Sequence, residues 1–256
     1  MTDYIKKFLN EHLKTLLFFA LSGLIGGFFT GIFALDGYPE EIRQQIYDGG
    51  LNEVSLGLVT ALQSAGYGII LGALGIIFAE KVGLYKNEKR LDKKPLIYTA
   101  IVAVVGGLSM ILFDVLWFGR FSEAIMSSYL TKPTVPLILA SLIYGGVIEE
   151  VMLRLFMLSL AAFILFKLFC KGRDEVSNWV FIVSNVICAL IFAAGHLPAT
   201  AMMLGITPMI VFRCFLLNGG IGFMFGWLYH RFGLRYSMLA HAGCHLISKL
   251  IWILFI

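Results

Sequence analysis

Residues 135–167, VPLILASLIYGGVIEEVMLRLFMLSLAAFILFK, decide the fold class of this chain, because they are apolar and long enough to cross a lipid bilayer. A membrane-spanning helix needs about 20 predominantly apolar residues. Further apolar stretches of suitable length lie on both sides of it, at 15–35, 58–80, 95–118, 179–194, 206–229 and 236–256. The sequence therefore predicts an all-α, polytopic transmembrane helical bundle. It has seven spans, or eight if Gly145, Gly146 and the acidic pair after them divide 135–167 into two helices.

The composition agrees with a protein that lies in lipid. Of the 256 residues, 59% are hydrophobic and 14% are charged, and the mean hydropathy is +0.86. Ordinary soluble domains are about 25% charged. The spans leave no room for a separate soluble catalytic domain, so we expect a single integrated membrane domain. The cysteines are widely spaced, without the pattern of a metal site or a disulfide framework, and we expect them to be reduced, packed thiols: Cys170, Cys188, Cys214 and Cys244.

The basic residues predict the orientation of the bundle. Lys and Arg cluster before the first span and in alternate connections, whereas residues 36–55, 119–134 and 197–205 are poor in them. By the positive-inside rule, the N-terminus is cytoplasmic and the C-terminus lies outside. The amphipathic residues 1–14 lead directly into the first span, which we expect to be retained rather than cleaved as a signal peptide. Because the net charge of +4 comes from these short clusters, the expected partner is the lipid bilayer and not nucleic acid.

Ionisable side chains inside apolar spans are costly unless they are paired or face a hydrated cavity. In EEVMLR, residues 149–154, Glu150 and Arg154 are four residues apart and face each other on a helix. Glu149 points about 100° away from Glu150 and lacks a partner of this kind. Glu149 is therefore a candidate general base, and Glu150 with Arg154 a candidate supporting pair. The alternative is a buried ionic cluster that only fixes the helix register.

Two histidine motifs lie in later apolar stretches. FAAGH at 192–196 contains Phe192 and His196, whose imidazole could orient a water molecule beside Glu149. HAGCH at 241–245 places His241 and His245 on one helical face, where two rings could bind zinc or donate hydrogen bonds to an oxyanion. Each motif alone is equally compatible with helix packing. We interpret GFMFG at 222–226 as a packing motif, and Asp114 and Arg213 as charges that reach the membrane surface from span ends.

Together these motifs resemble the CPBP family, which includes the type II CAAX prenyl endopeptidases and the bacteriocin-processing or immunity-associated Abi proteins. The resemblance covers about residues 134–248 and includes the glycine-rich stretch 222–229; it rests on Glu149, Glu150, Arg154, Phe192, His196 and His241. It implies a conical helical bundle with an internal cavity open to the membrane and the cytosol, in which a peptide bond is cleaved. Residues 1–133 would then hold the amphipathic segment and the first three helices, and residues 134–256 the catalytic core. His245 departs from the family, which commonly has asparagine at this position.

We therefore predict a CAAX-type intramembrane endopeptidase, expected in the plasma membrane of a prokaryote, that hydrolyses a membrane-associated peptide or protein without a cofactor. Glu149, assisted by His196, would deprotonate a water molecule. His241 and His245 would stabilise the oxyanion, with Glu150, Arg154 and Phe192 as supporting residues.

Three alternatives remain at this level. One is a zinc peptidase with Glu149, His196, His241 and His245 as ligands. Another is a non-catalytic membrane scaffold or immunity protein of the same family. The third is a proton-relaying transporter, which the absence of internal repeats disfavours.

The predicted boundaries also contain a conflict. If the fifth span ends at Ala194, His196 lies near the outer surface, His241 near the inner surface, and Glu149 between them. The motifs can meet only if the fifth helix continues through Leu204 or the bundle is strongly tilted.

Overall fold

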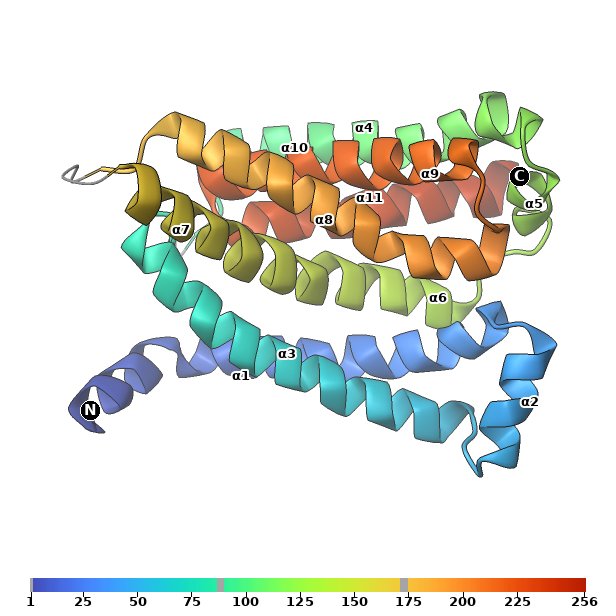
Figure 1. Ribbon diagram of the computed structural model, residues 1–256, viewed down its shortest axis with the longest axis horizontal. Coiled ribbons are helices and arrows are strands. Elements are labelled where there is room, and N and C mark those ends of the chain that lie inside the picture. The colour runs from blue at the N-terminus through green and yellow to red at the C-terminus, as the bar shows by residue number, and fades with distance from the viewer. Residues whose placement is uncertain (1, 87–89, 171–174) are drawn as a thin grey trace.

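The computed structural model describes residues 2–86, 90–170 and 175–256, and every regular element in these ranges is a helix (Figure 1). Seven helical segments are long and apolar enough to cross a membrane: Asp3–Leu35, Glu53–Lys81, Lys93–Arg120, Val135–Phe169, Asn178–Leu204, Pro208–Phe232 and Leu234–Phe255. The prediction of an all-α, polytopic membrane bundle is therefore confirmed, with seven spans in the described part of the chain.

The first and second spans form an antiparallel pair at one side of the bundle (Figure 1). Helix α1 (Thr2–Gly37) includes the amphipathic segment and the first span without a break, and α2 (Glu40–Asp48) connects it to α3 (Glu53–Lys81). The two long helices approach closely, since a methyl group on Gly23 would lie only 2.5 Å from the carbonyl oxygen of Ser64. Small residues at such contacts are the usual means of packing helices in lipid, where apolar side chains gain little by leaving the bilayer.

The fourth span is one continuous helix at the centre of the bundle. It consists of α6 (Val135–Leu139), the π-helical stretches η2 (Ala140–Glu149) and η3 (Val151–Leu158), and α7 (Ser159–Phe169). Gly145 and Gly146 do not divide it, so the possibility of an eighth span is not realised in the described residues. Packing explains the glycines instead, because a methyl group on Gly146 would lie 2.8 Å from the side chain of Ala242 on the last helix.

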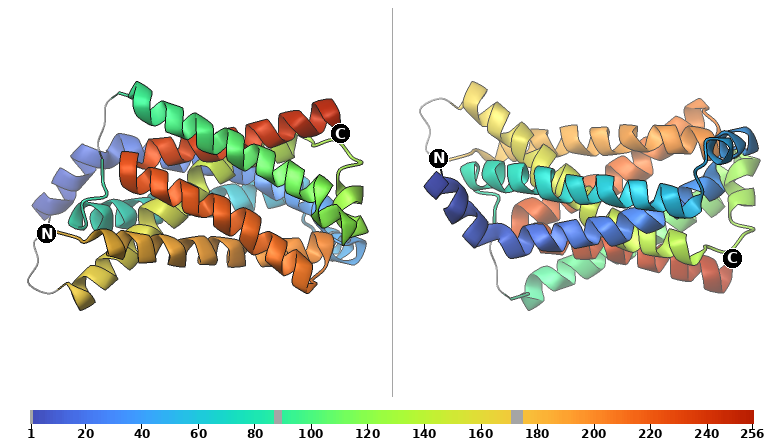
Figure 2. Two further views of the ribbon diagram at one scale, coloured as in Figure 1. Left: turned by 90° about the horizontal axis from the view of Figure 1, so that it is seen from above. Right: turned by 90° about the horizontal axis from the view of Figure 1, so that it is seen from below.

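The remaining spans surround this central helix. The third span contains α4 (Lys93–Leu116) and is followed by the short helices η1 (Phe118–Arg120) and α5 (Glu123–Ser128). The last three spans are α8 (Asn178–Leu204), the segment formed by α9 (Pro208–Cys214), η4 (Phe215–Gly219) and α10 (Gly220–Phe232), and α11 (Leu234–Phe255). Figure 2 shows α1 and α3 on one face of the molecule and α4, α8 and α10 on the opposite face. The fourth span contacts α1 and α11, and thus lies between the two faces.

The predicted end of the fifth span at Ala194 is wrong. Helix α8 continues to Leu204 and contains Pro198 in its interior. The prediction stopped where His196 and Pro198 lower the local hydropathy, but a proline is tolerated within a membrane helix when neighbouring groups satisfy the backbone. Of the two ways in which the histidine motifs could meet Glu149, the structure therefore has the longer fifth helix.

The interpretation of Asp114 and Arg213 as charges that reach the membrane surface is also wrong. The Arg213 guanidinium donates two hydrogen bonds to the Asp114 carboxylate, at 2.6 and 2.5 Å, and Asp114 is only 1% exposed. The hydroxyl of Tyr129 donates to the same carboxylate at 2.8 Å, and burial together with the Asp114 charge raises the pKa of Tyr129. This buried pair joins α4 to α9, which the span-by-span analysis of the sequence could not show. The four cysteines are buried and unbridged.

Candidate active site

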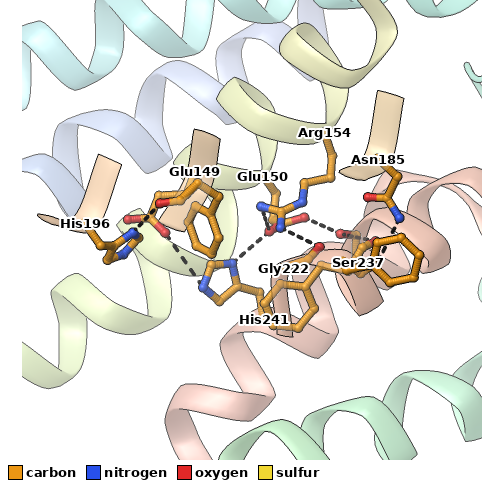
Figure 3. Close-up of polar contacts among 11 residues, drawn as sticks. Glu149, Glu150, Arg154, Asn185, His196, Gly222, Ser237 and His241 are labelled. Carbon is orange, nitrogen blue, oxygen red and sulfur yellow. Dashed lines mark hydrogen bonds and ion pairs between the residues drawn. The ribbon is translucent and has the colours of Figure 1, made fainter. Parts of the chain in front are cut away.

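Glu150 is the central acceptor of the polar cluster between the fourth span and α11 (Figure 3). Its side chain has no exposed surface, and Oε1 lies 2.9 Å from Nη1 of Arg154. The i, i+4 pair predicted from the sequence is therefore present. Two groups on α11 complete the environment: Nδ1 of His241 is 2.8 Å from Oε1, and the hydroxyl of Ser237 donates to Oε2. Glu150 is thus a buried carboxylate whose two oxygens are both occupied.

Arg154 connects this carboxylate to the glycine-rich helix α10. Its side chain is 2% exposed, and Nη2 donates a hydrogen bond of 2.8 Å to the carbonyl of Gly222. The guanidinium lies over the rings of Phe192 and Phe225, at 4.7 and 5.5 Å from their centroids. A methyl group on Gly222 would lie 3.0 Å from Nη2, so this glycine allows the arginine to reach the backbone. The sequence interpretation of 222–226 as packing alone was incomplete.

Glu149 has a different environment from its neighbour. Its side chain is 20% exposed, against 0% for Glu150, and its nearest ionisable partner is Nε2 of His241 at 3.8 Å from Oε2. At this distance the contact is an ion pair without a hydrogen bond. Glu149 is therefore an accessible carboxylate beside a buried and saturated one.

His241 lies between the two glutamates in Figure 3. A carboxylate can only accept, so Nδ1 carries the proton donated to Glu150, and Nε2 faces Glu149. The ring is fixed by two stacking contacts, with Phe225 at 4.5 Å and with His245 at 5.0 Å between ring centroids. An acid that holds one imidazole nitrogen determines the tautomer and the orientation of the other nitrogen.

His196 lies at the Glu149 end of the cluster in Figure 3. Its Nδ1 is 2.8 Å from the carbonyl oxygen of Phe192, one turn earlier on α8, and must be the donor because a carbonyl cannot donate. With the donor proton on Nδ1, the second ring nitrogen, Nε2, is left without a partner among the described residues. The described structure contains no direct hydrogen bond or ion pair between His196 and Glu149, so any cooperation between them requires an intervening molecule.

His245 completes the stack of rings on α11. Its Nδ1 is buried and has no hydrogen-bond partner among the described residues. A methyl group on Gly145 would lie 3.2 Å from Nε2 of His245 and 3.7 Å from Nε2 of His241. The glycine therefore leaves room for the two imidazole rings.

Ser237, Phe225 and the carbonyl of Gly222 contribute to the site in ways that the sequence analysis did not predict. Ser237 bonds Glu150, and Phe225 stacks on His241. Unlike a charged group, a hydroxyl or a phenyl ring has little free-energy cost in an apolar span, so neither residue was singled out as a functional candidate. Ser237 could have been found from its spacing, because it precedes His241 by four residues and shares its helical face. Asn185 lies deeper on α8 and donates to the carbonyl of Phe223 at 2.9 Å.

The residues proposed as zinc ligands do not form a metal site in this arrangement. Throughout residues 2–86, 90–170 and 175–256, no three His, Cys, Asp or Glu side chains are placed so that they could hold a metal ion. The four predicted ligands are Glu149, His196, His241 and His245.

A half-open cavity of about 590 Å³ lies next to the cluster, between the beginning of α1 and the beginning of α11. Val147 and Ala242 form part of its wall, each within two residues of a glutamate or histidine of the site. None of the predicted site residues lines it.

Comparison with known proteins finds one similar family. Residues 131–247 match the family model described as "Type II CAAX prenyl endopeptidase Rce1-like". No curated protein and no solved structure matches the chain. The matched range contains every residue of the cluster, from Glu149 to His245. The resemblance found in the sequence is therefore confirmed: the segment that carries the site is similar to the Rce1-like type II CAAX prenyl endopeptidases, a family of proteases.

Proposed function

We propose that this protein is an intramembrane endopeptidase in which Glu149 activates a water molecule for attack on a peptide bond. The observation that carries the proposal is the contrast between two adjacent acids. Glu150 is buried and saturated by Arg154, His241 and Ser237, whereas Glu149 is partly exposed and faces a ring nitrogen. A general base needs a free carboxylate oxygen within reach of its water, which only Glu149 offers.

His196 assists this step as an acceptor. Because its Nδ1 is held by the carbonyl of Phe192, the lone pair on Nε2 is available for the second hydrogen of the water. The water would lie between His196 and Glu149, which explains why they need no direct contact. This arrangement orients the lone pair of the water oxygen toward the substrate carbonyl.

His241 stabilises the oxyanion, and the charges of the cluster favour that role. In this proposal His241 acts as the imidazolium, with Nδ1–H bound to Glu150 and Nε2–H free to donate. Its charge and those of Glu149, Glu150 and Arg154 then sum to zero. When Glu149 takes a proton from water, the negative charge moves to the substrate oxygen, and the imidazolium can donate Nε2–H to it. The total charge of the buried cluster stays constant through the step, which limits the electrostatic cost in a medium of low dielectric constant. His245, stacked on His241, supplies a second donor.

The mechanism requires no metal ion. Purified enzyme is expected to contain no stoichiometric zinc by elemental analysis and to keep its activity after treatment with a chelator. Stoichiometric zinc, with cleavage lost on its removal and restored by its addition, would overturn the metal-free mechanism.

We further propose CAAX-type specificity for a membrane-associated peptide or protein, and a bundle with a cytoplasmic N-terminus in a prokaryotic plasma membrane. The family match supports the first proposal, and the distribution of Lys and Arg among the connections supports the second.

The decisive experiment compares wild type, Glu149→Gln and Glu123→Gln on a library of membrane peptides in liposomes, at matched amounts of folded protein. Glu123 is an exposed acid at the start of α5 and is the matched control. Cleavage by wild type and Glu123→Gln but not by Glu149→Gln is the expected result. Equal cleavage by all three removes Glu149 as the base, and no cleavage by any, across lipid compositions, favours a scaffold or immunity protein.

A further inference from the structure

The cavity between α1 and α11 has the charge distribution of a binding site for an amphiphile. Its walls are mainly apolar, with Phe18 and Phe19 from α1 facing Met238 and Leu239 from α11. Its charged lining residues are all basic: Lys14, Lys86 and Arg235. The volume of about 590 Å³ is within the range of about 300–1,000 Å³ that is usual for ligand pockets.

Two of these cations have no acidic partner among the described residues. Lys86 donates to the carbonyls of His230 and Arg231 at the end of α10, and so has a structural role. Lys14 and Arg235, in contrast, make no ion pair with any described residue. Glu80 on α3 is near this end of the bundle, but it faces Nε2 of His12 at 3.3 Å and does not line the cavity.

Both cations lie at the start of an apolar stretch of the sequence, where a membrane helix usually meets the lipid head groups. Lys14 is near the start of the first apolar stretch, and Arg235 is in the first turn of α11. Both helices begin at the same end of the bundle in Figure 1, and the apolar walls continue from there toward the middle of the spans. Basic side chains at this level attract the head groups of anionic lipids.

We propose that this cavity binds an anionic phospholipid of the surrounding bilayer. The phosphate lies between Lys14 and Arg235, and an acyl chain lies along Phe18, Phe19 and Met238. The bilayer is the source because the cavity is half-open and its cations are at head-group level, where phospholipids are present at high concentration. A neutral head group would bring no counterion to Lys14 and Arg235, which have none among the described residues.

The bound lipid would lie against the wall of the proposed active site. Val147 is two residues before Glu149, and Ala242 follows His241 directly. Ala242 also packs on Gly146, where η2 and α11 approach most closely. Occupancy therefore supports the contact that holds the glutamates opposite the histidines. The binding site itself does not depend on the proposed peptidase activity.

Native mass spectrometry of the full chain tests the proposal without any substrate. The protein is exchanged into nanodiscs of phosphatidylcholine containing a small fraction of phosphatidylglycerol, and retained lipid is measured after release. Wild type is expected to retain one phosphatidylglycerol in preference to phosphatidylcholine. Each basic residue near a membrane contributes about fivefold to such binding, or about 1 kcal/mol. Lys14→Gln/Arg235→Gln should therefore lower the retention of phosphatidylglycerol roughly 25-fold.

Lys6→Gln/Lys7→Gln is the matched control, because it removes the same charge from exposed positions of α1 outside the cavity. Unchanged retention in the cavity variant, equal loss in the control, or equal retention of phosphatidylcholine by wild type would each overturn the proposal. Competition by glycerol 1-phosphate as strong as that by intact lipid would also overturn it, since it would identify a simple phosphate site. Cleavage assays with Glu149→Gln remain interpretable in every case.

Discussion

The two adjacent glutamates should separate activity from stability when each is changed to glutamine. Glu150→Gln removes the charge that balances Arg154, whose guanidinium is 2% exposed and pairs with that carboxylate at 2.9 Å. It also leaves an amide NH2 group facing either Ser237 or His241, both of which act as donors toward Glu150. Removing one partner of a buried pair typically costs about 3–5 kcal/mol, so Glu150→Gln should be strongly destabilising.

Glu149→Gln should have the opposite profile. The side chain is partly exposed, and its one ionic contact with a described residue is 3.8 Å long, so the loss of stability should be below about 1 kcal/mol. Loss of the general base should lower the rate of cleavage by about 10²–10⁴-fold.

The buried cysteines of the chain can report the stability of the two variants. Its four cysteines are each at most 4% exposed, so a maleimide dye that becomes fluorescent on reaction reports unfolding in detergent. The midpoint temperature from the dye and the single-turnover cleavage rate at a low temperature are measured for both variants and for wild type. Equal destabilisation by the two substitutions, or a normal rate for Glu149→Gln, would refute the assignment of different roles to the two acids.

Three other predictions follow from the packing, the buried charge pair and the topology. Gly146→Ala should destabilise the protein by about 1–3 kcal/mol because the added methyl would lie 2.8 Å from the last helix, whereas Gly66→Ala, with open space around it, should be neutral or slightly stabilising in the same dye assay. Arg213→Gln should cost about 3–5 kcal/mol by leaving Asp114 buried without its partner, and the cleavage rate of the protein that remains folded should be unchanged. Gln44→Cys, exposed on α2, should react with an impermeant maleimide added outside intact cells, and protection there would reverse the proposed orientation.

The sequence predicted the spans well because apolar length is a property of each segment alone. All seven predicted stretches correspond to helical spans in the described structure, although most helices extend beyond the predicted limits. The end of the fifth span was predicted too early, since Pro198 and His196 made its second half resemble a connecting loop. Hydropathy measures the transfer of a segment to lipid, and it does not show that α8 stays helical through these two residues to Leu204.

The site was predictable where its geometry is local. The pair Glu150 and Arg154 follows from helical periodicity, and so does the separation of Glu149 from it. Ser237 and the carbonyl of Gly222 were not predicted, because their roles depend on which helices become neighbours. The roles of Glu149, His196, His241 and His245 in catalysis stay predictions that the experiments above address.

Because η2 and η3 are π-helical, the geometry of the site depends on the number of residues in this segment as well as on their identity. The two stretches comprise ten and eight residues, far more than the single wide turn that is common in membrane and soluble helices. Deleting one residue from an α-helix rotates everything beyond it by about 100°, and in the wider π-helix the rotation is smaller but still large. A one-residue deletion between Ala140 and Glu149 would thus turn one end of the span relative to the other while leaving composition and hydropathy almost unchanged. Homologues that share the motif should therefore tolerate substitutions here much better than insertions or deletions.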